Sequence, residues 1–230
     1  MRFSALLRKE LRECLPWMLL AAIAFFAFGG FFLRTTAYLG DRYWRYSRFS
    51  PGTTLSPYDL TCPTTLATVG PWLFFSSIGL GLILGVRHFW IPHFTRTWLF
   101  LLHRSVSRKT ILAAKLTAAL IACVISMGLV WIALFWYASQ PEVFAVQQTL
   151  RVFIEGWIFI MLGFVVYLGT ALSALSTANW YTTKIFGLIF ATLIFTTITS
   201  TSTVWAIGLI AVSTAILLVQ IFDTFLRREF

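Results

Sequence analysis

The chain carries little charge for its size. Charged residues make up 11% of its 230 residues, whereas hydrophobic residues make up 59%, and the mean hydropathy is +0.83. A soluble domain is about a quarter charged, because its surface must face water. The shortage of charge therefore excludes a soluble fold and predicts an integral membrane protein.

Sequence signatures of several other functions are also missing. The three cysteines include no CxxC pair, and the three histidines do not form a helical metal motif such as H-E-x-x-H. No G-x-S-x-G nucleophile turn occurs. The net charge of +10 has no polar domain to carry it, which argues against nucleic acid as a partner. We therefore expect no catalytic, metal-binding or cofactor-binding residues in this chain, and no enzyme activity of its own.

Long apolar runs fill most of the sequence. A membrane-spanning helix needs about 20 mostly apolar residues. We predict six spans, at residues 16–33, 71–91, 111–137, 152–175, 185–198 and 204–222. The runs are too long and too uniformly apolar for barrel strands, and a lipid-exposed backbone must satisfy its own hydrogen bonds. The predicted class is an all-α, multi-pass membrane protein whose residues 1–230 form one transmembrane domain.

The N-terminal residues 1–15 precede the first span and have their own pattern. Apolar residues recur there at helical spacing, with arginines, lysine and glutamate between them. We expect an amphipathic helix that lies on the inner surface of the lipid bilayer. The alternative is a cleaved signal peptide, which needs an apolar core of 7–15 residues. The apolar run here is longer and rich in phenylalanine, which favours retention.

The lysines and arginines predict the orientation. Most of them lie in the N-terminal arm, in the connection of residues 92–110 and at the C-terminus. Positive charge is enriched in cytoplasmic segments. We therefore expect both termini and residues 92–110 to be cytoplasmic, with residues 34–70 as an external loop, in a multi-pass protein of the cell (inner) membrane.

The cytoplasmic connection holds a second amphipathic segment. It follows Pro92, and its leucines and aromatic residues fall on one face of a short helix, followed by a basic turn. Such a segment suits the docking of another protein, and a positively charged loop that only sets topology explains it equally well. The candidate docking residues are Phe94, Trp98, Leu101, Leu102, Arg104, Val106 and Arg108.

This segment resembles a known family. Thr97 through Leu116 reads TWLFLLHRSVSRKTILAAKL, which is similar to the cytoplasmic coupling loop of type-2 ATP-binding-cassette (ABC) permeases, with the lysine of the following helix at Lys115. The six-span layout is similar across the whole chain. Ser105 stands where the family usually has proline, and residues 96–99 lack the acidic residue often found there.

The resemblance implies the permease subunit of an ABC exporter that moves a hydrophobic or amphipathic substrate. A homodimer, or a heterodimer with a second permease, would form the pathway, and a separate ATPase subunit holding ATP and magnesium would dock on residues 94–108. This chain contains no G-x-x-x-x-G-K-[ST] phosphate loop of its own. The alternative hypothesis is a non-transporting scaffold or assembly subunit of a membrane complex.

Two further sets of residues are candidates. Ser77, Gly81 and Gly85 recur every four residues, which lets two helices approach closely. They form either a packing seam within the chain or a dimer seam. Arg151 and Glu155 are four apart at the outer end of the fourth span and share a helix face. They are a possible pathway charge pair, or they simply reach the outer interface.

A reporter enzyme fused after Ser50 tests the predicted orientation. Because residues 34–70 are predicted to be external, a reporter that works only outside the cytoplasm should be active there. The same reporter fused after Phe230 should be silent, since the C-terminus is predicted to be cytoplasmic. A cytoplasmic signal from the Ser50 fusion would reverse the orientation.

Overall fold

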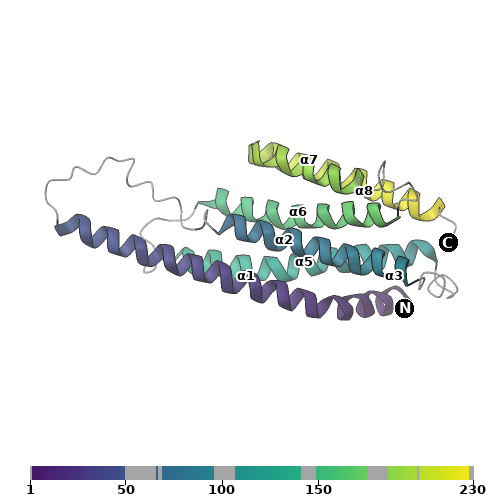
Figure 1. The fold of residues 1–230 in the computed structure, drawn as a ribbon, viewed down its shortest axis with the longest axis horizontal. Coiled ribbons are helices and arrows are strands. Elements are labelled where there is room, and N and C mark those ends of the chain that lie inside the picture. Colours follow the sequence, from purple (N-terminus) through teal and green to yellow (C-terminus); the bar gives the residue numbers. More distant parts are fainter. Residues whose placement is uncertain are drawn as a thin grey trace.

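The protein is a bundle of long helices (Figure 1). The computed structural model describes residues 2–49, 66, 69–95, 107–140, 149–175, 186–200 and 202–227. Its elements are α1 (Arg2–Phe49), α2 (Gly70–Gly85), the π-helix η1 (Val86–Trp90), α3 (Ile91–Phe94), α5 (Arg108–Ala138), α6 (Leu150–Leu175), α7 (Phe186–Ser200) and α8 (Thr203–Arg227). Within these residues all regular structure is helical.

The prediction of an all-α, multi-pass membrane protein is confirmed. Among the described residues, five helices are long and apolar enough to cross a membrane. They are Phe3–Thr35, Gly70–Trp90, Arg108–Ala138, Leu150–Leu175 and Thr203–Leu226. The remaining predicted span, residues 185–198, corresponds to α7, whose 15 residues are fewer than a full crossing needs.

The N-terminal boundaries differ from those expected. Helix α1 is continuous over 48 residues, so it joins residues 1–15, the span 16–33 and the first part of the predicted external loop. Pro16 lies inside α1 without ending it, as spanning helices tolerate. Residues 2–15 are therefore the first turns of α1 rather than a separate helix, and Glu10 and Cys14 within them are buried against other helices.

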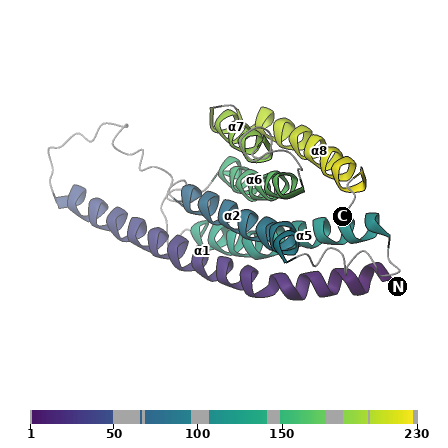
Figure 2. The same ribbon diagram turned by 45° about the vertical axis from the view of Figure 1, so that its right-hand side comes forward.

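Helix α6 is the centre of the bundle. It packs against α2, α5, α7 and α8, while α1 packs along α5. Figure 2 shows α6 between the α7–α8 pair and the layer formed by α1, α2 and α5. Every residue from Leu162 to Leu175 is buried. A helix buried on all sides in this way needs no polar face.

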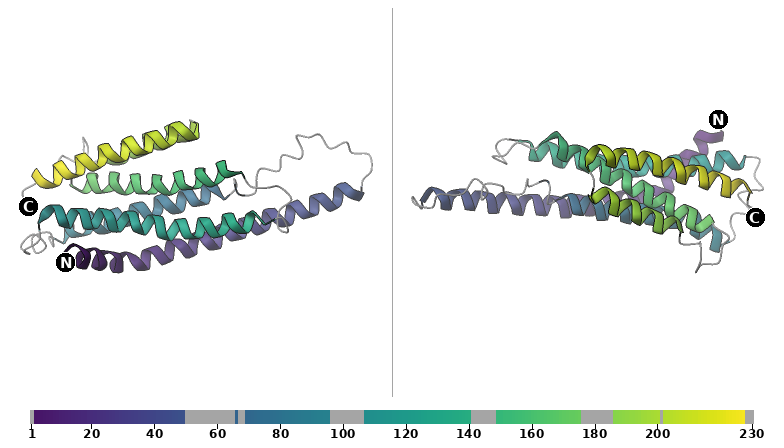
Figure 3. Two further views of the ribbon diagram at one scale, coloured as in Figure 1. Left: turned by 180° about the vertical axis from the view of Figure 1, so that it is seen from behind. Right: turned by 90° about the horizontal axis from the view of Figure 1, so that it is seen from above.

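The long helices alternate in direction along the chain, and η1 and α3 continue α2. As a result, the start of α1, the end of α3 and the end of α8 lie together at one end of the bundle (Figures 1 and 3). Helix α5 also begins at that end, and α2 and α6 begin at the opposite one. We call these the terminal end and the far end of the bundle.

Helix α2 meets α6 along the small residues that the sequence singled out. Ser77, Gly81 and Gly85 are all buried. A Cβ at Gly81 would overlap the carbonyl oxygen of Gly163, and one at Gly85 would lie 2.7 Å from the Cβ of Thr170. The structure therefore places these residues in a packing seam within the chain, the α2–α6 seam, where the two backbones touch.

Alanine substitutions test the α2–α6 seam. Gly81→Ala should lower the free energy of unfolding by about 1–3 kcal/mol, because the new methyl group must displace the α6 backbone. Gly79 is the matched control, since a Cβ there meets nothing within 4 Å. Gly79→Ala should be neutral or slightly stabilising. Equal thermal unfolding midpoints for the two variants in detergent would contradict the close contact.

Candidate functional site

Polar side chains from four elements meet inside the terminal end of the bundle. Two of them come from α1, and one each from η1, α5 and α6. Taken as whole residues, none of them is more than 5% exposed. This polar cluster consists of Glu10, Cys14, His88, Lys115 and Tyr167. Ionisable groups buried within spanning helices are costly, so a group of them is a candidate functional site.

An ion pair within the cluster joins α1 to α5. The Lys115 Nζ lies 3.0 Å from Oε2 of Glu10, and the two side chains are 6% and 3% exposed. Both charges have left water, and only their mutual attraction and further hydrogen bonds offset that cost. The pair therefore fixes α1 against α5 at one relative position.

His88 connects this pair to two other elements. Its Nε2 lies 3.2 Å from Cys14 Sγ and 3.8 Å from Glu10 Oε2, and its Nδ1 lies 3.0 Å from Tyr167 Oη. Tyr167 donates its only hydroxyl proton to the Lys115 carbonyl, at 3.3 Å. With that proton on the Lys115 carbonyl, Nδ1–H donates to the Tyr167 oxygen and Nε2 accepts from the Cys14 thiol. A neutral imidazole satisfies the whole chain of contacts.

The π-helix positions His88. The backbone N–H of Ile91 bonds to the carbonyl of Val86, five residues earlier. Pro92 supplies the local reason, because it has no N–H and its ring would clash with the carbonyl of His88 in an ordinary α-turn. The wider turn buries both His88 and Phe89. Such π-turns occur often at functional sites.

Sequence reasoning missed the polar cluster. Lys115 was noted only as part of the permease-like segment, and His88 was considered only as one of three histidines that form no metal motif. One signal was present: Glu10 lies four residues before Cys14, on the apolar face of the N-terminal helix. A carboxylate on an apolar face needs a partner.

In the described part of the chain, no group of three or more His, Cys, Asp or Glu residues is arranged to hold a metal ion.

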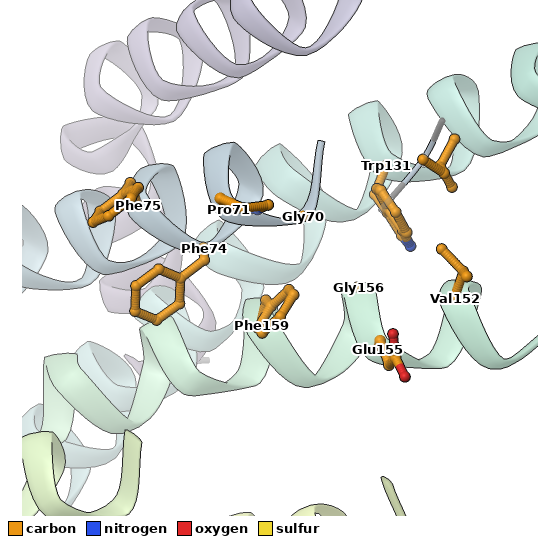
Figure 4. Close-up of a pocket in the computed structure, with 10 residues that line it drawn as sticks. Gly70, Pro71, Phe74, Phe75, Trp131, Val152, Glu155, Gly156 and Phe159 are labelled. Atoms are coloured by element: carbon orange, nitrogen blue, oxygen red, sulfur yellow. The ribbon is translucent and has the colours of Figure 1, made fainter. Parts of the chain in front are cut away.

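A pocket of about 430 Å³ lies at the far end of the bundle, between α2, α5 and α6. The indole of Trp131 packs directly on Gly156, and its N–H donates to the Phe153 carbonyl at 3.2 Å. The lining side chains are shown in Figure 4. They are Leu66, Gly70, Pro71, Phe74, Phe75, Trp131, Val152, Glu155, Gly156 and Phe159.

The predicted charge pair stands at this pocket. The Nε of Arg151 donates to Oε1 of Glu155 at 2.9 Å, and their side chains are 74% and 39% exposed. Glu155 also lines the pocket. The structure thus brings one member of the predicted pair to an apolar cavity.

The predicted docking residues are described only in part. Phe94 ends α3 with 72% of its surface exposed, and Arg108 begins α5 in an exposed position. Ser107 caps α5 by accepting a hydrogen bond from the Thr110 backbone at 3.3 Å. The other predicted docking residues, Trp98, Leu101, Leu102, Arg104 and Val106, lie outside the described residues.

The class of this protein is inferred from its fold and its candidate sites. No protein-family model, curated protein or solved structure matches the chain. The fold defines an all-α, multi-pass membrane protein. Its described residues hold a buried polar cluster at the terminal end and, at the far end, an apolar pocket with Glu155 in its lining.

Replacing one partner of the buried ion pair tests the polar cluster. Glu10→Gln should lower the free energy of unfolding by about 3–5 kcal/mol, because it leaves a buried ammonium without its carboxylate. Glu10→Met combined with Lys115→Met should recover much of that loss, since a buried pair is often replaceable by apolar groups. Chemical unfolding in detergent measures both.

The matched control is the exposed pair of Lys9 and Glu13, whose charged atoms lie 3.7 Å apart on the same helix. Glu13→Gln should change the free energy of unfolding by less than about 1 kcal/mol. If Glu10→Gln behaves like Glu13→Gln, the ion pair does not hold α1 against α5.

Proposed function

We propose that the chain is the permease subunit of an ABC exporter and moves a hydrophobic or amphipathic substrate across the cell membrane. The observation that carries this proposal concerns Lys115. It belongs to the permease-like segment Thr97–Leu116, and its ammonium is paired with Glu10 inside the bundle. The C-terminal end of this segment is therefore held to the core of the bundle by an ion pair, and the preceding part of the segment would dock an ATPase.

The polar cluster supplies a route for mechanical coupling. A displacement of the start of α5 acts on α1 through the Lys115–Glu10 pair. It acts on α6 through the hydrogen bond from Tyr167 to the Lys115 carbonyl, and from Tyr167 it reaches η1 through His88. Four elements therefore share one set of polar contacts. These contacts support the proposal that a movement of the docking segment displaces the helices of the whole bundle.

The proposal requires two kinds of partner. Because the sequence has no phosphate loop, ATP and magnesium are held by a separate ATPase subunit, which docks on residues 94–108. A second permease, identical or different, completes the pathway. Both termini and the docking segment face the cytoplasm in this arrangement, since most lysines and arginines belong to these segments.

Co-purification with the ATPase tests the proposal. The chain, solubilised in mild detergent from its native membrane, should bring an ATPase subunit with it. Leu101→Asp and Leu102→Asp should each reduce the recovered ATPase at least about tenfold, because a charge in an apolar contact costs several kcal/mol.

Leu150→Asp is the matched control. Leu150 is 70% exposed and begins α6 at the far end of the bundle, whereas the end of α3 and the start of α5, which flank the docking segment, lie at the terminal end. This variant should retain the ATPase. Absence of any ATPase from the wild-type preparation, or its full recovery with Leu101→Asp and Leu102→Asp, would instead support the non-transporting scaffold.

A further inference from the structure

Two glycines and a tryptophan form part of the wall of the far-end pocket. Gly70 begins α2, and a Cβ there would lie 3.4 Å from the ring of Phe159. Gly156 leaves room for the indole of Trp131 to lie on the α6 backbone. The walls of α2, α5 and α6 around the pocket are therefore close-packed, and most of the large side chains in its lining are aromatic. Its volume of about 430 Å³ is within the range of small-molecule sites.

The pocket changes from polar to apolar along α6. Arg151 and Glu155 occupy the first turns of this helix, and Phe159 follows one turn deeper. Phe74 packs edge-on against Phe159 at a centroid distance of 5.9 Å. A ligand aligned with α6 would therefore meet charge at one end and aromatic rings about 6 Å further in. That gradient matches an amphiphile with a charged head and an apolar tail.

The pocket borders the surface that faces lipid. Phe75 lines the pocket and is 65% exposed. Leu82 and Val86 follow it at seven and eleven residues, on the same helix face, and they are 36% and 42% exposed. Exposed apolar side chains on a spanning helix contact acyl chains. The ligand therefore has a lateral route from the bilayer, past Phe75.

The ion pair beside the pocket selects the head group, because Glu155 lines the pocket and Arg151 is bonded to Glu155. Arg151 and Glu155 present opposite charges within 2.9 Å of each other, and both are partly exposed. A zwitterionic phospholipid offers a phosphate for the guanidinium and an ammonium for the carboxylate. An anionic lipid supplies only the first of these contacts and repels Glu155.

We propose that this pocket binds a zwitterionic phospholipid, with an acyl chain between Phe74, Trp131 and Phe159 and with the head group on Arg151 and Glu155. The binding site stands on the pocket and its charges alone. Its further meaning, that such a lipid is the class of substrate moved, rests on the proposed permease function.

Lipid titration of the purified chain, without an ATPase, tests the binding site. Native mass spectrometry compares phosphatidylethanolamine with phosphatidylglycerol of identical acyl chains. The wild-type chain should prefer phosphatidylethanolamine about tenfold, and Glu155→Gln should reduce that preference to about twofold or less. Val152→Trp, which fills the pocket, should weaken the binding of both lipids.

Glu13→Gln is the matched control, because it also removes one carboxylate from an exposed pair four residues apart. It should leave the lipid preference unchanged. Equal affinity of the wild-type chain for the two lipids, or the same loss in Glu13→Gln as in Glu155→Gln, overturns the proposal. The result does not depend on co-purification of an ATPase, so either proposal can fail while the other stands.

Discussion

The buried ion pair between Glu10 and Lys115 constrains how this bundle assembles. Within a bilayer, apolar side chains gain little from leaving lipid, so they specify helix positions weakly. Two charges removed from water do so strongly, because each needs the other within a few ångströms. The 3.0 Å contact fits one register of α1 on α5, and a slide of even one residue moves a helix by about 1.5 Å.

The α2–α6 seam also limits how the helices can be arranged around the polar cluster. A Cβ at Gly81 would lie 3.3 Å from the backbone nitrogen of Tyr167, and one at Gly85 would lie 3.3 Å from its carbonyl oxygen. The close approach of the two helices therefore determines where the Tyr167 side chain begins. Its hydroxyl is then in reach of both His88 and the Lys115 carbonyl. Backbone packing and polar contacts depend on each other here.

Hydropathy predicts most of this fold because each span is a local property of the sequence. The predicted span 111–137 matches α5 (Arg108–Ala138), and 152–175 matches α6 (Leu150–Leu175). The extension of α1 to Phe49 was not predicted, because its last turns are polar. The polar cluster is non-local: Glu10 and Lys115 are 105 positions apart, and Cys14 and His88 are 74 apart. Only the packing of the helices brings them together.

One face of α6 joins the two candidate sites. Glu155, Phe159, Gly163 and Tyr167 recur every four residues, which is the ridge along which helices commonly interlock. Glu155 and Phe159 line the pocket, Gly163 touches the backbone of Ser77 in the seam, and Tyr167 belongs to the polar cluster. The ridge spans about 18 Å. Because no flexible side chain separates the two backbones at Gly163, a shift of α6 against α2 at the polar cluster must also change the walls of the pocket.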